Sequence, residues 1–295
     1  MLRQYCSAEI HRYRLTVTHT MKPTLLLGIS PCPNDTYIFH HLIHGLEERG
    51  YDLEVEYHDI ETLNELACAG KFDIVKVSYA LLDSLLDRYV LLRSGGALGY
   101  GVGPLLVSTQ PRQLFAGARV LSPGARTTAQ KLFSAYSTID TSIEYRPFKT
   151  IMPALINGEA DFGILIHESR FTYEQQKLHR IADLGTWWET TTGAPIPLGG
   201  IVMRRSLGHA LAVTLQNDIR QSIITATRTM GETLAFCRQH AQELDDHVML
   251  SHIQLYVNDF SFDIGEDGEK AIRHFLGQEH ASNTTTTTDE IWVTQ

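Results

Sequence analysis

Short apolar segments alternate with segments of helical spacing along the first third of the chain, and this alternation constrains the fold most strongly. Strands are expected at Thr24–Ile29, 53–60 and 72–77. Helices are expected at about 34–46, 62–69 and 78–86. Strands that alternate with helices in this way form a largely parallel sheet that the helices cover.

The same alternation restarts after Pro111. Strands are expected at 119–121, 142–145 and 162–166, with helices up to about 136 and at 151–157. A return strand near 201–202 then leads into segments that are mostly helical, up to about 276. A second unit of strands and helices is therefore inserted between a first unit and a helical C-terminal return.

Two such units joined by two crossovers are typical of the two-lobed, type II periplasmic-binding-protein-like α/β fold. We therefore expect this fold, with parallel or mixed sheets covered by helices. We expect crossovers near Ser108 and Gly199. One lobe then comprises 24–108 plus 199–280, and the other comprises 109–198. Residues 1–23 form an extension and the Thr-rich residues 281–295 a low-complexity tail that frays. A ligand is expected in the cleft between the lobes.

Composition excludes several classes of protein. The 295 residues are 43% hydrophobic and 20% charged, with a formal net charge of −9 and no run of Lys or Arg. Nucleic acid or an anionic membrane is therefore not expected as a partner. No segment has the apolar length of a secretory signal or of a membrane span. The four cysteines are scattered, without zinc spacing, so we expect reduced thiols, no metal and a cytoplasmic protein.

The segment 161–173 carries the clearest candidate for catalysis. Its apolar run at 162–166 ends directly in His167, Glu168, Ser169 and Arg170. Ligands bind at the carboxyl ends of the strands in open α/β sheets. A neutral imidazole is suited to proton abstraction near pH 7, so His167 is a candidate base.

Three other strand–helix junctions are candidates for binding an anionic ligand. They are the Pro-rich loop 30–35, the segment Lys76, Val77 and Ser78, and the pair Thr127 and Thr128. Hydroxyl and N–H groups at helix N-termini bind carboxylates, but the same residues also cap helices without any ligand. In the first junction Asn34 or Asp35 is the expected helix cap. Both interpretations remain open.

Several motifs, in order along the chain, resemble the 1,4-dihydroxy-6-naphthoate synthases of the futalosine route to menaquinone. They are Ser-Pro-Cys-Pro-Asn-Asp-Thr from 30, Val-Lys-Val-Ser-Tyr from 75, Arg-Ser-Gly-Gly-Ala-Leu-Gly from 93, Gly-Val-Gly-Pro from 101, Pro-Gly-Ala-Arg-Thr-Thr-Ala from 123, Ile-His-Glu-Ser-Arg-Phe-Thr-Tyr from 166 and Tyr-Val-Asn from 256. The resemblance covers about 25–276.

The resemblance implies a carbon–carbon lyase that splits cyclic dehypoxanthinyl futalosine into 1,4-dihydroxy-6-naphthoate and dihydroxyacetone. It implies that His167 is the general base and that the residues at 76–78 and 127–128 bind the anionic substrate, with no cofactor. Asn34 is a further candidate for binding, and Glu168 and Arg170 are candidate supports of His167. Two alternatives remain, a chorismate dehydratase of the same pathway and a non-catalytic protein that binds a small carboxylate.

Overall fold

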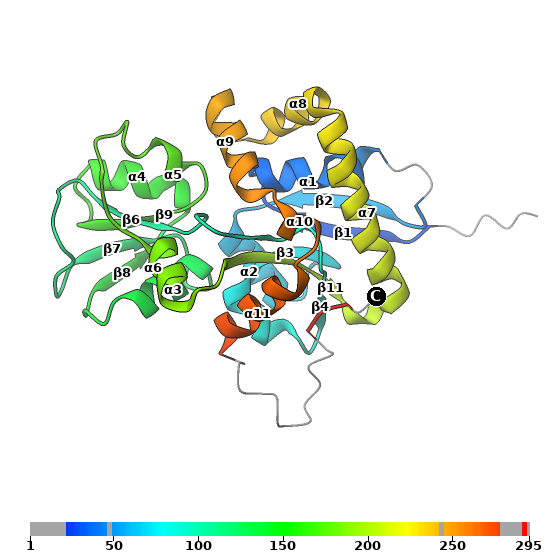
Figure 1. Ribbon diagram of the computed structural model, residues 1–295, viewed down its shortest axis with the longest axis horizontal. Coiled ribbons are helices and arrows are strands. Elements are labelled where there is room, and N and C mark those ends of the chain that lie inside the picture. The colour runs from blue at the N-terminus through cyan, green and yellow to red at the C-terminus, as the bar shows by residue number, and fades with distance from the viewer. Residues whose placement is uncertain (1–21, 46–48, 242–244, 278–290, 294–295) are drawn as a thin grey trace, which may run out of the picture.

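The computed structural model describes residues 22–45, 49–241, 245–277 and 291–293. Figure 1 shows two lobes side by side, each built on one sheet. Most of the expected N-terminal extension lies outside the described residues. Within them, no helix combines the length and the apolar character that crossing a bilayer requires.

The larger lobe, lobe 1, is built on a six-stranded mixed sheet. Its strands are β1 (Thr24–Ile29), β2 (Asp52–Tyr57), β3 (Ile74–Ser78), β4 (Tyr89–Leu91), β5 (Ala97–Gly99) and β11 (Ile196–Arg204). The order is β2-β1-β3-β11-β4, and β5 also pairs with β11. β1 is parallel to β2 and β3, whereas β11 is antiparallel to β3.

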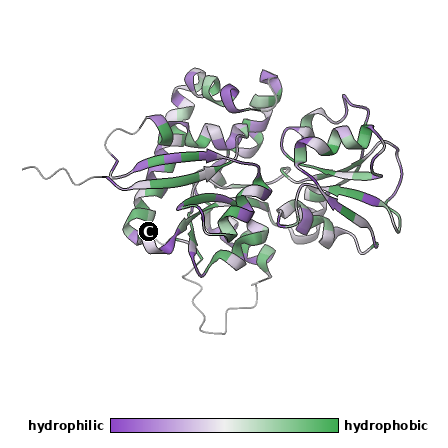
Figure 2. Cartoon of the chain, turned by 180° about the vertical axis from the view of Figure 1, so that it is seen from behind, coloured by the Kyte–Doolittle hydropathy of each residue, from purple (hydrophilic) through white to green (hydrophobic). Residues whose placement is uncertain are grey.

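Helices cover both faces of this sheet. One face packs on α1 (Pro33–His44) and α7 (His209–Arg228), through a core that includes Leu27, Ile74 and Ile219. The other face packs on α2 (Ile60–Cys68), the 3₁₀ helix η1 (Tyr79–Leu85) and α11 (Gly265–Leu276). The remaining helices of the lobe are α8 (Met230–His240), α9 (Asp246–Tyr256) and α10 (Asp259–Phe262), which follow α7, and η2 (Arg205–Leu207), which joins β11 to α7. Figure 2 shows hydrophobic and hydrophilic residues mixed along these helices, as expected for helices with one buried side.

The smaller lobe, lobe 2, is built on a five-stranded sheet of order β10-β6-β9-β7-β8. Its strands are β6 (Leu105–Ser108), β7 (Arg119–Ser122), β8 (Ser142–Tyr145), β9 (Phe162–Leu165) and β10 (His179–Asp183). Its helices are α3 (Thr128–Tyr136), α4 (Phe148–Ile156), α5 (Ser169–Thr172) and α6 (Leu184–Thr192).

The strand pairing corrects the expected boundaries of the lobes. β6 pairs with β9 and β10, so lobe 2 begins at Leu105 and not at 109. β11 pairs with β5 from Ile196 onwards, so lobe 2 ends before 196 and not at 198. The crossovers therefore lie at 100–104 and 193–195. The apolar run 105–108 was assigned to lobe 1, but its four residues are buried within the sheet of lobe 2.

The C-terminal residues also differ from the expectation. We predicted that 281–295 would fray, but Ile291, Trp292 and Val293 are buried. The N–H of Leu91 donates to the carbonyl of Ile291 at 2.7 Å, and the N–H of Val293 donates to the carbonyl of Leu91 at 3.0 Å. These three residues thus pair with β4, and the rest of the predicted tail lies outside the described residues.

Candidate active site

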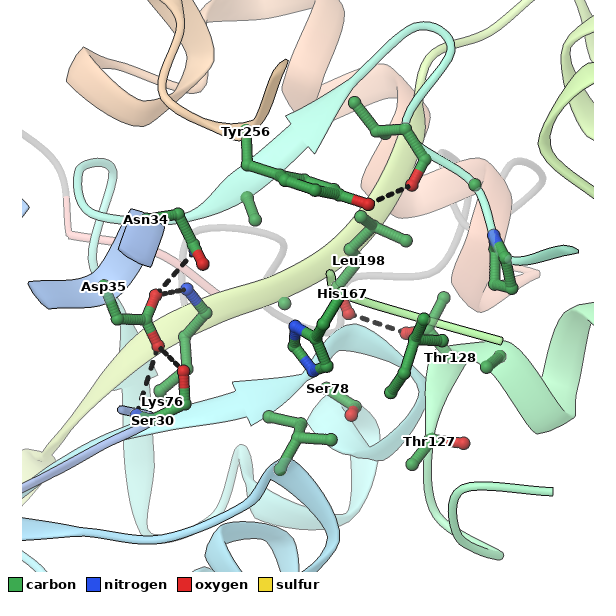
Figure 3. Close-up of a pocket in the computed structure, with 18 of the residues that line it drawn as sticks. Ser30, Asn34, Asp35, Lys76, Ser78, Thr127, Thr128, His167, Leu198 and Tyr256 are labelled. Carbon is green, nitrogen blue, oxygen red and sulfur yellow. Dashed lines mark hydrogen bonds and ion pairs between the residues drawn. The ribbon is translucent and has the colours of Figure 1, made fainter. Parts of the chain in front are cut away.

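A cavity lies between the two lobes, at the ends of strands from both sheets. Its polar lining is contributed by Ser30, Asn34, Asp35, Lys76, Ser78, Thr127, Thr128, His167, His252 and Tyr256. Apolar residues, among them Ile60, Val102 and Leu198, complete it. Figure 3 shows His167 between the Asp35–Lys76 side and the Thr127–Thr128 side of the cavity.

His167 occupies a strained backbone position directly after β9. Its φ angle is +54°, in the left-handed region that residues other than Gly rarely adopt. Strain of this kind costs about 1–3 kcal/mol and concentrates at functional sites. Burial lowers the pKa of His167 from its ordinary value to about 4. The imidazole is therefore neutral at pH 7, as a proton acceptor must be.

The contact of His167 with lobe 1 involves Cys32. The Cys32 sulfur lies 3.3 Å from Nδ1 of His167. Burial and the neighbouring Glu168 carboxylate raise the pKa of the Cys32 thiol well above its usual range. Cys32 is thus a neutral thiol and not an activated nucleophile. Because it belongs to lobe 1 and His167 to lobe 2, this contact joins the lobes at the candidate base.

Cys32 is also the N-cap of α1, without a side-chain capping bond. We expected Asn34 or Asp35 to cap this helix, and that prediction is wrong. Pro33 takes the first helical position, where its fixed φ angle is favourable, so the helix begins earlier. Asn34 and Asp35 lie in the first turn instead, and both line the cavity.

Asp35 is the centre of a buried polar network. Its Oδ1 accepts hydrogen bonds from Lys76 Nζ at 2.6 Å and from Asn34 Nδ2 at 2.9 Å. Its Oδ2 accepts from the Ser30 hydroxyl at 2.7 Å and from the Ser30 N–H at 3.2 Å. Nε2 of His252 lies 2.9 Å from Oδ1 of Asn34. The positive charge of Lys76 is therefore already paired within lobe 1.

The predicted segment 76–78 contributes two of its three residues to the cavity. Side chains alternate along a strand, so Lys76 faces α1 while Val77 packs in the core on the opposite face. The prediction that Val77 lines the binding site is wrong for its side chain. The Ser78 hydroxyl accepts a hydrogen bond from Asn64 Nδ2 at 3.0 Å, which leaves its own O–H proton available.

Thr127 and Thr128 both line the cavity, and both also have structural roles. The Thr127 hydroxyl caps α3 by accepting from the Gln130 N–H at 3.2 Å, and it donates to the Gly124 carbonyl at 2.8 Å. The Thr128 hydroxyl donates to the carbonyl of Leu198 at 2.7 Å, across the interlobe boundary. The structure thus shows helix capping by Thr127 and places both residues on the cavity wall, while binding of a ligand by them stays a prediction.

The candidate supports Glu168 and Arg170 follow His167 in the chain and make different contacts. Glu168 is buried, and one of its carboxylate oxygens lies within 4.8 Å of both the Cys32 sulfur and a His167 ring nitrogen. In the part of the chain that the structure describes, these three residues are the one group with metal-ligand proximity. Arg170 donates to the Gly103 carbonyl and to Asp183 Oδ2 at 3.1 Å, so it holds the crossover segment.

Ser30, Asp35, His252 and Tyr256 were not singled out individually among the predicted site residues, although Ser30 and Asp35 belong to the candidate loop 30–35. Two local signals pointed to them: Asp35 adjoins Asn34 in the first motif, and Tyr256 opens the last motif of the resemblance. His252 lies four residues before Tyr256, on the same side of α9, and the two rings are 4.5 Å apart.

Known proteins with similar sequences share one activity name. A family model described as menaquinone biosynthesis matches residues 25–281. A 1,4-dihydroxy-6-naphtoate synthase of Thermus thermophilus is 47% identical over 257 residues, which cover 87% of this chain and 94% of that protein. A 1,4-dihydroxy-6-naphtoate synthase of Streptomyces coelicolor is 44% identical over 259 residues, or 86% of this chain and 92% of that protein.

Solved structures confirm the expected fold. A protein of Archaeoglobus fulgidus superposes with a TM-score of 0.82 at 28% identity, over 88% of this chain and 97% of that one. The periplasmic aliphatic sulphonate binding protein of Escherichia coli superposes with a TM-score of 0.60 at 10% identity, over 92% and 93%. At that identity the second match shows the fold alone, which is the predicted periplasmic-binding-protein-like one.

Proposed function

The chain belongs to the menaquinone-biosynthesis family of enzymes, and we propose that it acts as a 1,4-dihydroxy-6-naphthoate synthase. The proposed reaction splits cyclic dehypoxanthinyl futalosine into 1,4-dihydroxy-6-naphthoate and dihydroxyacetone. The observation that carries the proposal is the neutral, partly buried His167 at the centre of an interlobe cavity. Identity above 40% to two proteins that carry this activity name supports the choice of substrate.

In the proposed mechanism His167 removes a proton from a substrate carbon next to a carbonyl group. The electron pair of the broken C–H bond then drives cleavage of the bond to the sugar-derived fragment. This fragment leaves with the electrons of that bond and takes up one proton, which balances the proton removed by His167. Formation of an aromatic ring supplies much of the driving force, so one well-placed base suffices. General-base catalysis of this kind contributes about 10²–10⁴-fold to a rate.

The contact with Cys32 fits either tautomer of His167, and in the proposed mechanism Nδ1 carries the hydrogen. If Nδ1–H of His167 donates to the Cys32 sulfur, 3.3 Å away, then Nε2 carries the lone pair that accepts the proton. Because Cys32 belongs to lobe 1, this tautomer is favoured only while the lobes are closed around the substrate. Closure also excludes water from the cavity.

The substrate carboxylate is best placed at the N-terminus of α3. The first N–H groups of a helix have no partner within it and attract anions. Thr127 and Thr128 lie at this terminus, and the Ser78 hydroxyl faces them from lobe 1. Lys76 contributes less directly, because its ammonium group is paired with Asp35.

Incubation of the purified protein with separate substrates tests the proposal. Cyclic dehypoxanthinyl futalosine should yield 1,4-dihydroxy-6-naphthoate, followed by absorbance, whereas chorismate should remain unchanged. Dehydration of chorismate would favour the related dehydratase of the pathway. Binding of the first substrate without turnover would favour a non-catalytic carboxylate-binding protein.

A further inference from the structure

The side-chain amide of Asn34 can take only one orientation. Its Nδ2 donates to Asp35 Oδ1 at 2.9 Å, and the same oxygen accepts from Lys76 Nζ at 2.6 Å. A carboxylate paired with an ammonium group only accepts hydrogen bonds, so the amide nitrogen must face it. The Asn34 carbonyl oxygen therefore points to His252.

This orientation sets the tautomer of His252. Its Nε2 lies 2.9 Å from the Asn34 carbonyl oxygen, which can only accept, so Nε2 carries the hydrogen. Burial, helped by His167 and Lys76, lowers the pKa of His252 well below its ordinary value, so the ring is neutral. A neutral imidazole with hydrogen on Nε2 has a lone pair on Nδ1.

Nδ1 of His252 is a buried acceptor, and no described residue supplies a donor to it. The neighbouring groups are occupied elsewhere: the Tyr256 hydroxyl donates to the Val102 carbonyl, and Nδ1 of His167 faces Cys32. Buried polar atoms are almost always satisfied, and one left without a partner costs about 1–3 kcal/mol. Because His252 lines the cavity, a bound ligand can supply the donor.

We propose that Nδ1 of His252 accepts a hydrogen bond from a hydroxyl group of the bound substrate and so determines specificity. This proposal rests on the proposed function. The His252 ring is nearly parallel to that of His167, with 6.1 Å between their centres. The hydroxyl group therefore belongs to the part of the substrate next to the carbon that loses its proton. A neutral acceptor at this point favours a hydroxyl over an anionic oxygen, which has no hydrogen to donate.

Two substitutions at this position separate the acceptor from the rest of the ring. His252→Gln places its amide near the Nε2 position, so it keeps the bond to Asn34 and removes the acceptor. His252→Asn places its amide near the Nδ1 position, so it keeps an acceptor and loses that bond. We expect kcat/KM to fall about 10- to 100-fold in His252→Gln, and by clearly less in His252→Asn. Equal losses in the two variants, or wild-type activity in His252→Gln, would overturn the proposal.

Binding measurements identify which hydroxyl group is recognised. Dihydroxyacetone and 1,4-dihydroxy-6-naphthoate are titrated separately into the wild type and His252→Gln. Weaker binding of one compound to the variant assigns the contact to the sugar-derived fragment or to the naphthoate ring. Unchanged binding of both compounds would contradict the proposal.

A third measurement does not depend on turnover. In protein with ¹⁵N-labelled histidine, the His252 signals, assigned by comparison with His252→Asn, should show hydrogen on Nε2 and none on Nδ1 at pH 7. A signal from Nδ1–H would refute the proposed acceptor. If the wild type does not convert the substrate, the proposed function fails, and the binding and ¹⁵N measurements still decide on His252.

Discussion

The buried pair of Asp35 and Lys76 allows a quantitative test of how lobe 1 supports the site. Nζ of Lys76 lies 2.6 Å from Oδ1 of Asp35, and the two side chains are 5% and 1% exposed. Removal of one partner of a buried pair costs about 3–5 kcal/mol, because the other charge stays buried without compensation. The two partners differ, however, in what remains around them.

Lys76→Met leaves Asp35 with three donors, namely the Ser30 hydroxyl, the Ser30 N–H and Asn34 Nδ2. We therefore expect a cost near the lower limit, about 3 kcal/mol in the free energy of unfolding. Asp35→Leu leaves the Lys76 ammonium group without another hydrogen-bond acceptor among the described residues. Its cost should lie nearer to about 5 kcal/mol.

Urea unfolding followed by circular dichroism measures both variants. The control is Arg238→Met, which removes a pair with Asp246 whose side chains are 44% and 58% exposed. Exposed pairs contribute about 0–1 kcal/mol, so this variant should unfold almost as the wild type does. The reasoning would be refuted if Lys76→Met cost no more than the control, or if it cost more than Asp35→Leu.

Two further predictions concern acid stability and the contact at the crossover. Burial lowers the pKa of His40 to about 4, so the unfolded chain binds a proton there below about pH 6.5 and the folded chain does not. The free energy of unfolding should therefore fall as the pH decreases from about 6.5 to 4. This fall should be less steep in His40→Phe than in a variant in which the exposed His179 is replaced. If urea titrations gave the same dependence of the unfolding free energy on pH in both variants, the reasoning would be contradicted. A Cβ atom on Gly103 would lie 2.2 Å from the Gly185 backbone, whereas one on Gly50 would meet nothing within 4 Å. Gly103→Ala should thus lower the melting temperature by several degrees and Gly50→Ala should not, and equal melting temperatures would refute the contact.

Strands with a clear apolar run could be predicted from the sequence. Thr24–Ile29 is such a run and has the predicted bounds. Ser142–Tyr145 also has the predicted bounds, although it alternates polar and apolar residues and is mostly exposed. β4, β5 and β10 were missed. They are short, and each forms by pairing with a distant strand, as β5 does with β11. The intrinsic strand propensity of a short segment does not reveal a pairing partner that is distant in the sequence.

Candidate site residues could be predicted from the sequence where they lie at or near the junction of one strand and the helix that follows it. His167 and Lys76 were found in this way, since both lie where a strand ends near a helix. The bond between His252 and Asn34 joins residues 218 positions apart, and it depends on how α9 packs on α1. A motif does not show which of its side chains reach the cavity. Val77 belongs to the same motif as Lys76 but packs in the core, because neighbouring residues of a strand face opposite sides.

The central claim is that His167 is the base, and single-turnover rates of wild type and His167→Ala with cyclic dehypoxanthinyl futalosine test it most directly. The account predicts a loss of about 10²–10⁴-fold in the rate of naphthoate formation, with the substrate still bound and the fold unchanged by circular dichroism. A folded His167→Ala variant that forms naphthoate at nearly the wild-type rate would contradict it.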